Sequence, residues 1–205
     1  MREKGVFIEN DAYRLEGMLY EGEKKGVIVT HPHPLYGGNM NNNVVEAIVR
    51  AYQGANFTTL RFNFRGVGES EGRHDGGGGE QRDVEAAIRY LKNLGISELH
   101  LAGYSFGAWV NAMGIKRYTE VEVFVMISPP VAFLDYSTAT HEPRIRFVIT
   151  GSNDQIAPPH LVKDLVEKWN PRARFVIIKG CDHFYWGKEQ ELIKFLNEFV
   201  RGKAD

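Results

Sequence analysis

The chain has 205 residues, of which 43% are hydrophobic and 25% charged, and its formal net charge at pH 7 is -1. This length and hydrophobic content predict one domain, residues 1–205, with a single buried core. The near-neutral charge argues against a nucleic-acid-binding protein, and the apolar runs are too short to cross a bilayer, so neither nucleic acid nor membrane is an expected partner.

After an N-terminal pair of strands that turns at Asn10–Asp11, strands and helices alternate along the chain. Compact β-branched or aromatic runs predict strands at residues 6–9, 13–20, 26–30, 57–64, 99–102, 122–128, 144–150 and 174–179. Apolar residues at helical spacing predict helices at residues 43–52, 82–94, 108–116, 159–169 and 188–201. The glycine-rich segment 65–79 is expected to be a loop. This alternation predicts an α/β fold with a mainly parallel sheet and helices on both faces.

The segment Gly103-Tyr104-Ser105-Phe106-Gly107 lies between a predicted strand and a predicted helix. It fits Gly-x-Ser-x-Gly, the nucleophile elbow, in which a sharp turn lifts the serine hydroxyl clear of the sheet. The glycines are needed there because side chains at those positions would collide with the neighbouring strand and helix. We therefore take Ser105 as the candidate nucleophile.

A serine hydroxyl needs a positioned base, and that base needs an orienting acid. In this arrangement the chain order is serine, acid, histidine, and the partners follow the carboxyl ends of strands. Asp154 lies directly after the strand at 144–150, and His183 follows the last strand. We expect Ser105, Asp154 and His183 to form a catalytic triad. If His183 is the base, activity is expected to fall below about pH 6.5 as imidazole protonates.

Other residues of the same types are weaker candidates. Asp135 also follows a strand, and Asp182 adjoins the histidine, although neighbours on an extended segment usually point apart. His141 and His160 do not directly follow a strand. Cys181, the single cysteine, is not part of a nucleophile-elbow motif and is expected to be a small buried core residue. One cysteine cannot form an internal disulfide, and no apolar segment follows the charged N-terminus, so a cytoplasmic location is expected.

An oxyanion formed during acyl transfer needs donors aimed at it in advance. The N–H of Phe106, directly after the nucleophile, is one expected donor. The second is expected from the loop at residues 31–38, where two prolines have no N–H to offer. Leu35 is the first donor after those prolines, with Tyr36 behind it, and we take Leu35 as the second member of the oxyanion hole.

Two other motifs are read as structural, so no metal and no cofactor are expected. His31 and His33 are separated by proline, and no further ligand cluster stands nearby in sequence, so bracing of the loop is favoured over metal binding. The glycines at 66–79 lack the third glycine of a dinucleotide motif, because Glu71 occupies that position, and no Gly-Lys-Ser/Thr is present.

Five motifs together resemble the α/β-hydrolase superfamily, and more narrowly the small dienelactone-hydrolase-like serine hydrolases. They are residues 31–40 (HPHPLYGGNM), 63–70 (NFRGVGES), 103–107 (GYSFG), 151–154 (GSND) and 182–184 (DHF). The resemblance implies an eight-stranded sheet with an antiparallel second strand, and carries nucleophile, acid and base onto Ser105, Asp154 and His183. Dienelactone hydrolase itself uses cysteine at the elbow, so its substrate is not transferred; carboxylesterase activity is what the serine members imply.

The connection at residues 129–143 is too short for a helical cap domain, which predicts an open site. Nine apolar side chains are candidates for an acyl-binding rim, with the core as the alternative: Leu35, Tyr36, Phe106, Pro130, Val131, Phe133, Phe184, Tyr185 and Trp186. The expected reaction is hydrolysis of a short-to-medium acyl ester or thioester, a small-molecule substrate. A peptidase or amidase with the same triad, and a non-catalytic binding protein, remain alternatives; the oligomeric state is not predicted.

Overall fold

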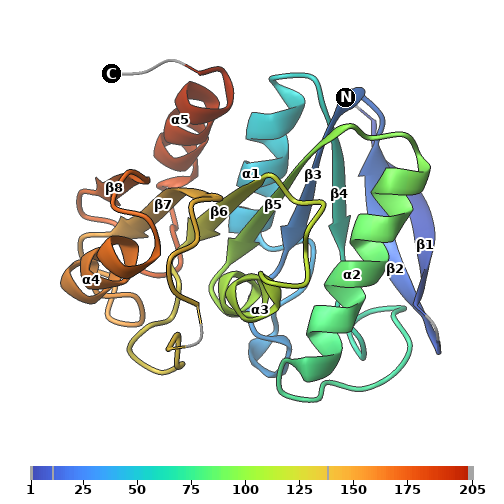
Figure 1. The fold of residues 1–205 in the computed structure, drawn as a ribbon, viewed down its shortest axis with the longest axis horizontal. Coiled ribbons are helices and arrows are strands. Elements are labelled where there is room, and N and C mark those ends of the chain that lie inside the picture. The colour runs from blue at the N-terminus through green and yellow to red at the C-terminus, as the bar shows by residue number, and fades with distance from the viewer. Residues whose placement is uncertain (1, 11, 138, 203–205) are drawn as a thin grey trace.

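A computed structural model of the chain describes residues 2–10, 12–137 and 139–202, so Asp11 of the predicted turn lies outside the described residues. Within these residues, eight strands form one sheet in the order β1-β2-β4-β3-β5-β6-β7-β8 (Figure 1). The strands are β1 (Lys4–Asn10), β2 (Tyr13–Tyr20), β3 (Glu23–Thr30), β4 (Phe57–Phe62), β5 (Glu98–Tyr104), β6 (Val123–Ile127), β7 (Ile145–Gly151) and β8 (Arg174–Ile178).

The sheet is antiparallel at one edge and parallel elsewhere. Strand β2 pairs antiparallel with both β1 and β4. All other neighbouring strands, from β4 through β3 and β5 to β8, pair in parallel. This confirms the predicted mostly parallel eight-stranded sheet with an antiparallel second strand. The carboxyl ends of β3, β5, β6, β7 and β8 therefore lie together at the carboxyl edge of the sheet, where ligand sites of parallel sheets lie.

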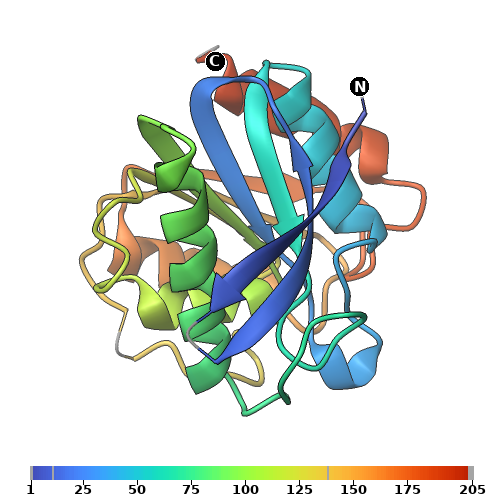
Figure 2. The same cartoon turned by 90° about the vertical axis from the view of Figure 1, so that its right-hand side faces the viewer.

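Helices cover both faces of the sheet, as predicted. The described residues contain α1 (Asn43–Gln53), α2 (Gly78–Asn93), α3 (Phe106–Gly114), α4 (Pro159–Trp169) and α5 (Glu189–Val200). The buried side chains form two clusters: one contains residues of α1 and α5, and the other contains residues of α2, α3 and α4. Viewed along the sheet, α2 lies on one side and α1 and α5 lie on the other (Figure 2).

Strand β5, which leads into the elbow, shows why its sequence is apolar without alternation. Leu99 and Leu101 belong to the cluster with α2 and α3, whereas Ala102 and Tyr104 belong to the cluster with α1 and α5. Both faces of a central parallel strand are covered by helices, so every position from Leu99 to Tyr104 is buried. The strand is thereby fixed from both sides up to its last residue, and Ser105 follows it directly.

Helix α2 begins at Gly78, four residues earlier than the sequence predicts. The reason is Glu80, whose side chain is fully buried and accepts a hydrogen bond from the Gly77 N–H at 2.7 Å. A glutamate at the third helical position that reaches back to the residue before the helix satisfies an N–H that has no partner inside the helix. Two glycines can therefore open this helix in spite of their low helix propensity.

A buried ion pair fixes the loop between β4 and α2. The Arg65 guanidinium lies 2.7 Å from the carboxylate of Asp83, whose side chain is completely buried on α2. The same carboxylate accepts the backbone N–H of Arg65 at 3.0 Å and the side-chain amide of Asn10. A buried carboxylate with this many donors holds its partners in one arrangement. The loop predicted at residues 65–79 ends at residue 77 instead, because α2 begins at Gly78, and it is anchored to β1 and to α2.

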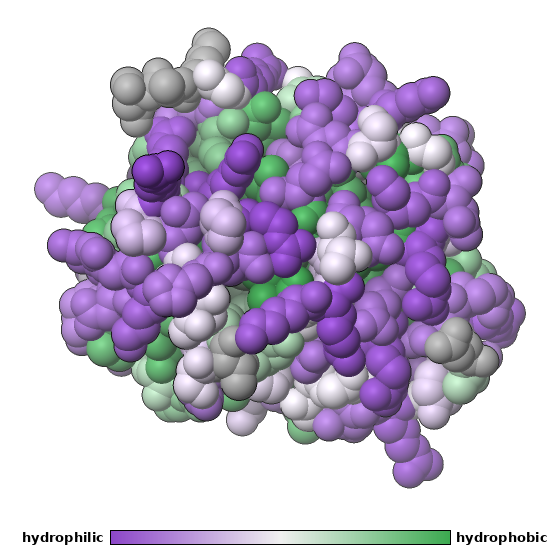
Figure 3. All heavy atoms as spheres, in the orientation of Figure 1, coloured by the Kyte–Doolittle hydropathy of each residue, from purple (hydrophilic) through white to green (hydrophobic). Residues whose placement is uncertain are grey.

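The connection between β6 and β7 contains turns but no helix among its described residues, in agreement with the predicted lack of a large cap. The indole N–H of Trp109 on α3 donates to the Asp135 carbonyl at 2.9 Å and ties this connection down. No described helix combines the length and apolar character needed to cross a membrane. The face of the molecule in Figure 3 is mostly hydrophilic, with hydrophobic side chains visible in small areas.

His31 braces the end of β3 against the segment that follows β4. Its Nε2 accepts the Phe64 N–H at 3.0 Å, and its Nδ1 lies 2.7 Å from the Pro32 carbonyl oxygen, so Nδ1 carries the proton. Strand β4 ends at Phe62, earlier than predicted, because the Phe64 N–H is used by this histidine. Burial lowers the pKa of His31 to about 4, and both ring nitrogens are occupied. Both contacts agree with the bracing interpretation of His31.

We expect the stability of the fold to fall in mildly acidic solution, partly because of His31. The unfolded chain binds a proton on this imidazole below its ordinary pKa of about 6.5, whereas the folded chain resists protonation until about pH 4. The free energy of unfolding must then decrease as the pH falls through this window, by up to about 3 kcal/mol from His31.

Urea denaturation at a series of pH values between 4 and 7 measures this effect. A His31→Gln variant is expected to have lower stability at pH 7 but a visibly flatter pH dependence. His100, whose pKa burial also lowers to about 4, and His33, whose pKa burial also lowers, contribute to the slope that remains. His160→Gln, at an exposed position, is the matched control and keeps the wild-type slope. An unchanged slope in His31→Gln would contradict the assignment.

Candidate active site

Ser105 sits on a strained turn between β5 and α3. Its backbone angles are φ 53° and ψ -120°, a region that residues other than glycine rarely adopt. A Cβ on Gly103 would lie 2.7 Å from the Ala108 nitrogen, and one on Gly107 would lie 2.6 Å from the Thr30 oxygen. Neither position has space for a side chain, so the two glycines are required by close approach. The sharp strand-to-helix turn expected of a nucleophile elbow is present at Ser105.

Three predicted residues meet at the carboxyl edge of the sheet. His183 Nε2 lies 2.9 Å from Ser105 Oγ, and His183 Nδ1 lies 2.9 and 3.0 Å from the two oxygens of Asp154. The side chain of Asp154 is fully buried and that of His183 is 8% exposed. Residues 105, 154 and 183, distant in sequence, thus form one hydrogen-bonded row that is largely shielded from solvent.

The environment of Asp154 keeps its carboxyl group ionised. Burial alone would raise its pKa, but the hydrogen bond and charge of His183, the Ala157 N–H and the Ser128 hydroxyl outweigh burial and lower it. Asp154 Oδ1 accepts the N–H groups of Ile156 and Ala157 at 2.9 and 2.7 Å. A carboxylate held this way orients the imidazole, with the proton on Nδ1 and the free electron pair of Nε2 facing the serine.

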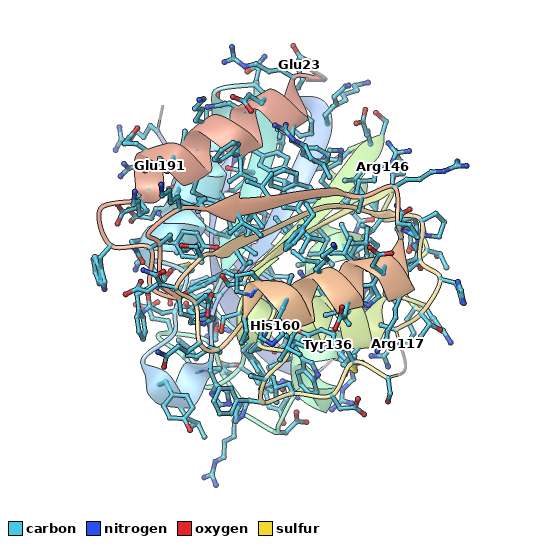
Figure 4. The ribbon with its side chains drawn as sticks, turned by 90° about the vertical axis from the view of Figure 1, so that its left-hand side faces the viewer. Glu23, Arg117, Tyr136, Arg146, His160 and Glu191 are labelled. Atoms are coloured by element: carbon cyan, nitrogen blue, oxygen red, sulfur yellow. The ribbon has the colours of Figure 1, made fainter. Side chains whose placement is uncertain are left out.

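The rival residues lie elsewhere or have other partners. The carboxylate of Asp135 accepts the N–H and hydroxyl of Ser137, and that of Asp182 accepts the Phe184 N–H. His160 is exposed on α4 (Figure 4), and His141 is exposed in the β6–β7 connection. The Cys181 thiol is buried, and burial raises its pKa to about 12, so it is not a thiolate nucleophile.

A layer of buried hydroxyls behind the row was missed by the sequence analysis. The Tyr104 hydroxyl donates to the His183 carbonyl at 2.6 Å, and the hydroxyls of Ser128 and Tyr185 lie 2.8 Å apart. Ser128 and Tyr185 both have positive φ, 43° and 60°. Strained backbone of this kind gathers at functional sites, where the surrounding packing holds it. Tyr185 is fully buried, so its assignment to an apolar rim is wrong.

The loop after β3 corrects one expected oxyanion donor. The Leu35 N–H, predicted to be free, donates to His33 Nδ1 at 3.2 Å, and the Tyr36 N–H donates to the His33 carbonyl at 3.1 Å. The short helix Pro34–Tyr36 turns both groups back onto the loop. For the His33 N–H, by contrast, the described residues supply no acceptor. Sequence analysis overlooked this residue, although it is the one non-proline position within Pro32–Pro34.

The His33 side chain packs directly against Phe106, the residue that follows Ser105. Its ring centroid lies 4.6 Å from that of Phe106. Phe106 is the first residue of α3, and the N–H groups in the first turn of a helix have no partner within it. The loop after β3 and the start of α3 therefore lie side by side next to Ser105.

Five of the predicted rim side chains are exposed and come from loops at the carboxyl ends of β3, β6 and β8. They are Leu35 (73% exposed), Tyr36 (87%), Phe133 (74%), Phe184 (55%) and Trp186 (74%). Val131 is partly buried against the core. Phe106 and Pro130 are buried, so for them the core alternative holds. The ring of Phe184 contacts that of His183 at 5.9 Å between centroids, which places apolar surface beside the row.

The site contains no metal ligand set. Among the residues that the structure describes, no group of three or more histidine, cysteine, aspartate or glutamate side chains is arranged to hold an ion. His33, the partner of His31 in the metal alternative, instead has its Nδ1 bound to the Leu35 N–H.

Comparison with known proteins gives relatives over the whole chain. An uncharacterized protein from Rickettsia prowazekii is 39% identical over 208 residues, which cover 95% of this chain and 87% of that protein. An α/β serine hydrolase homologue from Coxiella burnetii has a TM-score of 0.89 and 32% identity, covering 100% of this chain and 99% of that one.

A further structural relative is described as having no lid. It is an α/β serine hydrolase without lid from Xanthomonas campestris, with a TM-score of 0.90 and 31% identity over 100% of this chain and 97% of that one. No protein-family model matches the chain. On its fold and on these relatives over its full length, the chain belongs to the α/β-hydrolase superfamily.

Proposed function

We propose that the protein is a serine esterase that hydrolyses short-to-medium acyl esters or thioesters through an acyl-Ser105 intermediate. The observation that carries the proposal is the continuous row from the Asp154 carboxylate through the His183 imidazole to the Ser105 hydroxyl. All three residues stand at the hydrogen-bond distances that proton transfer requires. The family relatives, which include serine hydrolases, support hydrolysis as the reaction class.

Acylation begins when Ser105 Oγ attacks the substrate carbonyl carbon and its proton passes to His183 Nε2. Asp154 stabilises the resulting imidazolium by charge and by the Nδ1 hydrogen bond. The tetrahedral intermediate then collapses: its bond to the alcohol or thiol leaving group breaks, and His183 returns the proton to that group. In deacylation, His183 takes a proton from water, the hydroxide attacks the acyl carbon, and Ser105 leaves with the proton.

The negative oxygen of each tetrahedral intermediate needs two donors, and we assign the N–H groups of Phe106 and His33. Phe106 provides a donor at the N-terminus of α3, where the helix dipole also favours negative charge. His33 replaces Leu35 as the second donor because the Leu35 N–H is already bound to His33 Nδ1, whereas the His33 N–H has no acceptor among the described residues.

The exposed rim supports the substrate class that we propose. Leu35, Tyr36, Phe133, Phe184 and Trp186 offer apolar surface to an acyl chain at the mouth of the site. The β6–β7 connection carries no helical cap in its described part. Apolar contact near the reacting carbon combined with an open site favours short-to-medium acyl groups.

We expect replacement of the row residues to abolish turnover of p-nitrophenyl butyrate while the fold persists. Ser105→Ala removes the nucleophile, for an expected loss of about 10⁶-fold in kcat. Asp154→Asn leaves the imidazole in the wrong tautomer, for a loss of about 10⁴-fold. Cys181→Ala, the control for the other candidate nucleophile, retains activity. Circular dichroism verifies that each variant is folded. A Ser105→Ala variant with wild-type turnover would end the proposal.

A panel of p-nitrophenyl esters with acyl chains of increasing length tests the substrate class. The value of kcat/KM is expected to rise from acetyl to medium chains, as apolar contact with the rim increases, and to fall for the longest chains. Trp186→Ala and Phe133→Ala should reduce the preference for medium chains over acetyl by several-fold, at about 25 cal/mol per Å² of lost apolar contact. Best turnover on the longest chains, or faster cleavage of peptide p-nitroanilides than of esters, would overturn the substrate assignment.

A further inference from the structure

A second histidine–carboxylate pair lies on the oxyanion side of Ser105 and takes no part in the row of Ser105, His183 and Asp154. His74 Nδ1 lies 2.7 Å from Glu80 Oε1. His74 belongs to the loop between β4 and α2, and Glu80 to the first turn of α2. The Glu80 side chain is fully buried and that of His74 is 15% exposed. The pair is thus built into the structure.

Glu80 is held in one position by its other partners. Its carboxylate accepts the Gly77 N–H at 2.7 Å and the Asp75 N–H at 3.2 Å, in addition to His74 Nδ1. A buried carboxylate cannot give up these donors without a desolvation penalty, so its position is well determined. The His74 ring is bound through Nδ1 to this carboxylate. Its orientation is therefore fixed by Glu80, which is held by its own partners.

The His74 ring contacts the rings of both residues to which we assign oxyanion donors. The His74 ring centroid lies 5.0 Å from that of His33 and 5.5 Å from that of Phe106. The His33 and Phe106 rings are in contact with each other at 4.6 Å. In Figure 2 the loop from β4 to α2 passes beside the short helix that follows His33. The three rings form one cluster, and a shift of His74 displaces two residues that carry assigned donors.

We propose that His74, fixed by Glu80, is a positioning residue for the oxyanion hole. The inference rests on the proposed function. An oxyanion donor has to be placed to within about 0.5 Å, by side chains whose own orientation is locked by packing and hydrogen bonds. The cluster also preserves the chemistry of His33: burial and the neighbouring His74 lower the pKa of His33, so its Nδ1 stays free to accept the Leu35 N–H.

The test is His74→Phe, which keeps a ring in the cluster and removes the hydrogen bond to Glu80. Because oxyanion donors act in the transition state, kcat and kcat/KM are expected to fall together, by about 10-fold, while KM stays within about 2-fold of wild type. The inhibition constant of a trifluoromethyl ketone, which forms a tetrahedral adduct with the serine, should rise by the same factor. His74→Ala, which adds no bulk, is expected to show the same pattern and serves if His74→Phe does not fold.

Complete titration with a fluorophosphonate counts the folded active sites, so kcat is expressed per titrated site. The matched control is His160→Phe, in which an exposed histidine is also replaced by phenylalanine. This variant is expected to behave as wild type. If His74→Phe and His74→Ala titrate fewer sites but keep the wild-type kcat per site, the role of His74 is structural and the inference is overturned. An unchanged inhibition constant for the ketone overturns it as well. A wild-type protein that is neither titrated nor active refutes the proposed function itself, and the inference with it.

Discussion

The site depends on the close packing of the turn that carries Ser105. The backbone of β3 approaches α3 so closely that only glycine fits at position 107, and Gly103 is crowded by the same helix. This packing forces Ser105 into a strained conformation, which the buried strand on one side and the helix on the other maintain. The hydroxyl therefore has a fixed position at the sheet edge, and the loops that follow the neighbouring strands are arranged around it.

Burial divides the site into two electrostatic regions. On one side, Asp154 and His183 are shielded from solvent, so the carboxylate acts on the imidazole with little screening. Hydroxyls of Tyr104, Ser128 and Tyr185 pack behind them and leave few other conformations open. On the other side, the rings of His33, His74 and Phe106 pack together beside the N–H groups that we propose as oxyanion donors. Each region is held by its own buried carboxylate, Asp154 or Glu80.

The sequence predicts the fold and the row of three residues because both follow from position along the chain. A strand must end before Ser105, Asp154 and His183, and parallel strands bring their carboxyl ends together. The second oxyanion donor was not predicted correctly, since a free N–H is distinguished from a bonded one by a side-chain rotamer. From the sequence, the Leu35 N–H has no evident partner. In the structure the His33 ring is turned so that its Nδ1 accepts this N–H. His74 and Glu80 were missed because the segment around them reads as a glycine-rich loop, and their contact depends on tertiary packing.

The most direct measurement is the intact mass of the protein during turnover of p-nitrophenyl butyrate, quenched in acid within the first turnovers and followed by peptide mapping. Acid quenching protonates the imidazole and stops deacylation, so the intermediate is preserved. The account predicts one butyryl group per chain, on the peptide that contains Ser105. Turnover without any acylated protein, or acylation at Cys181 or at another residue in place of Ser105, would contradict it.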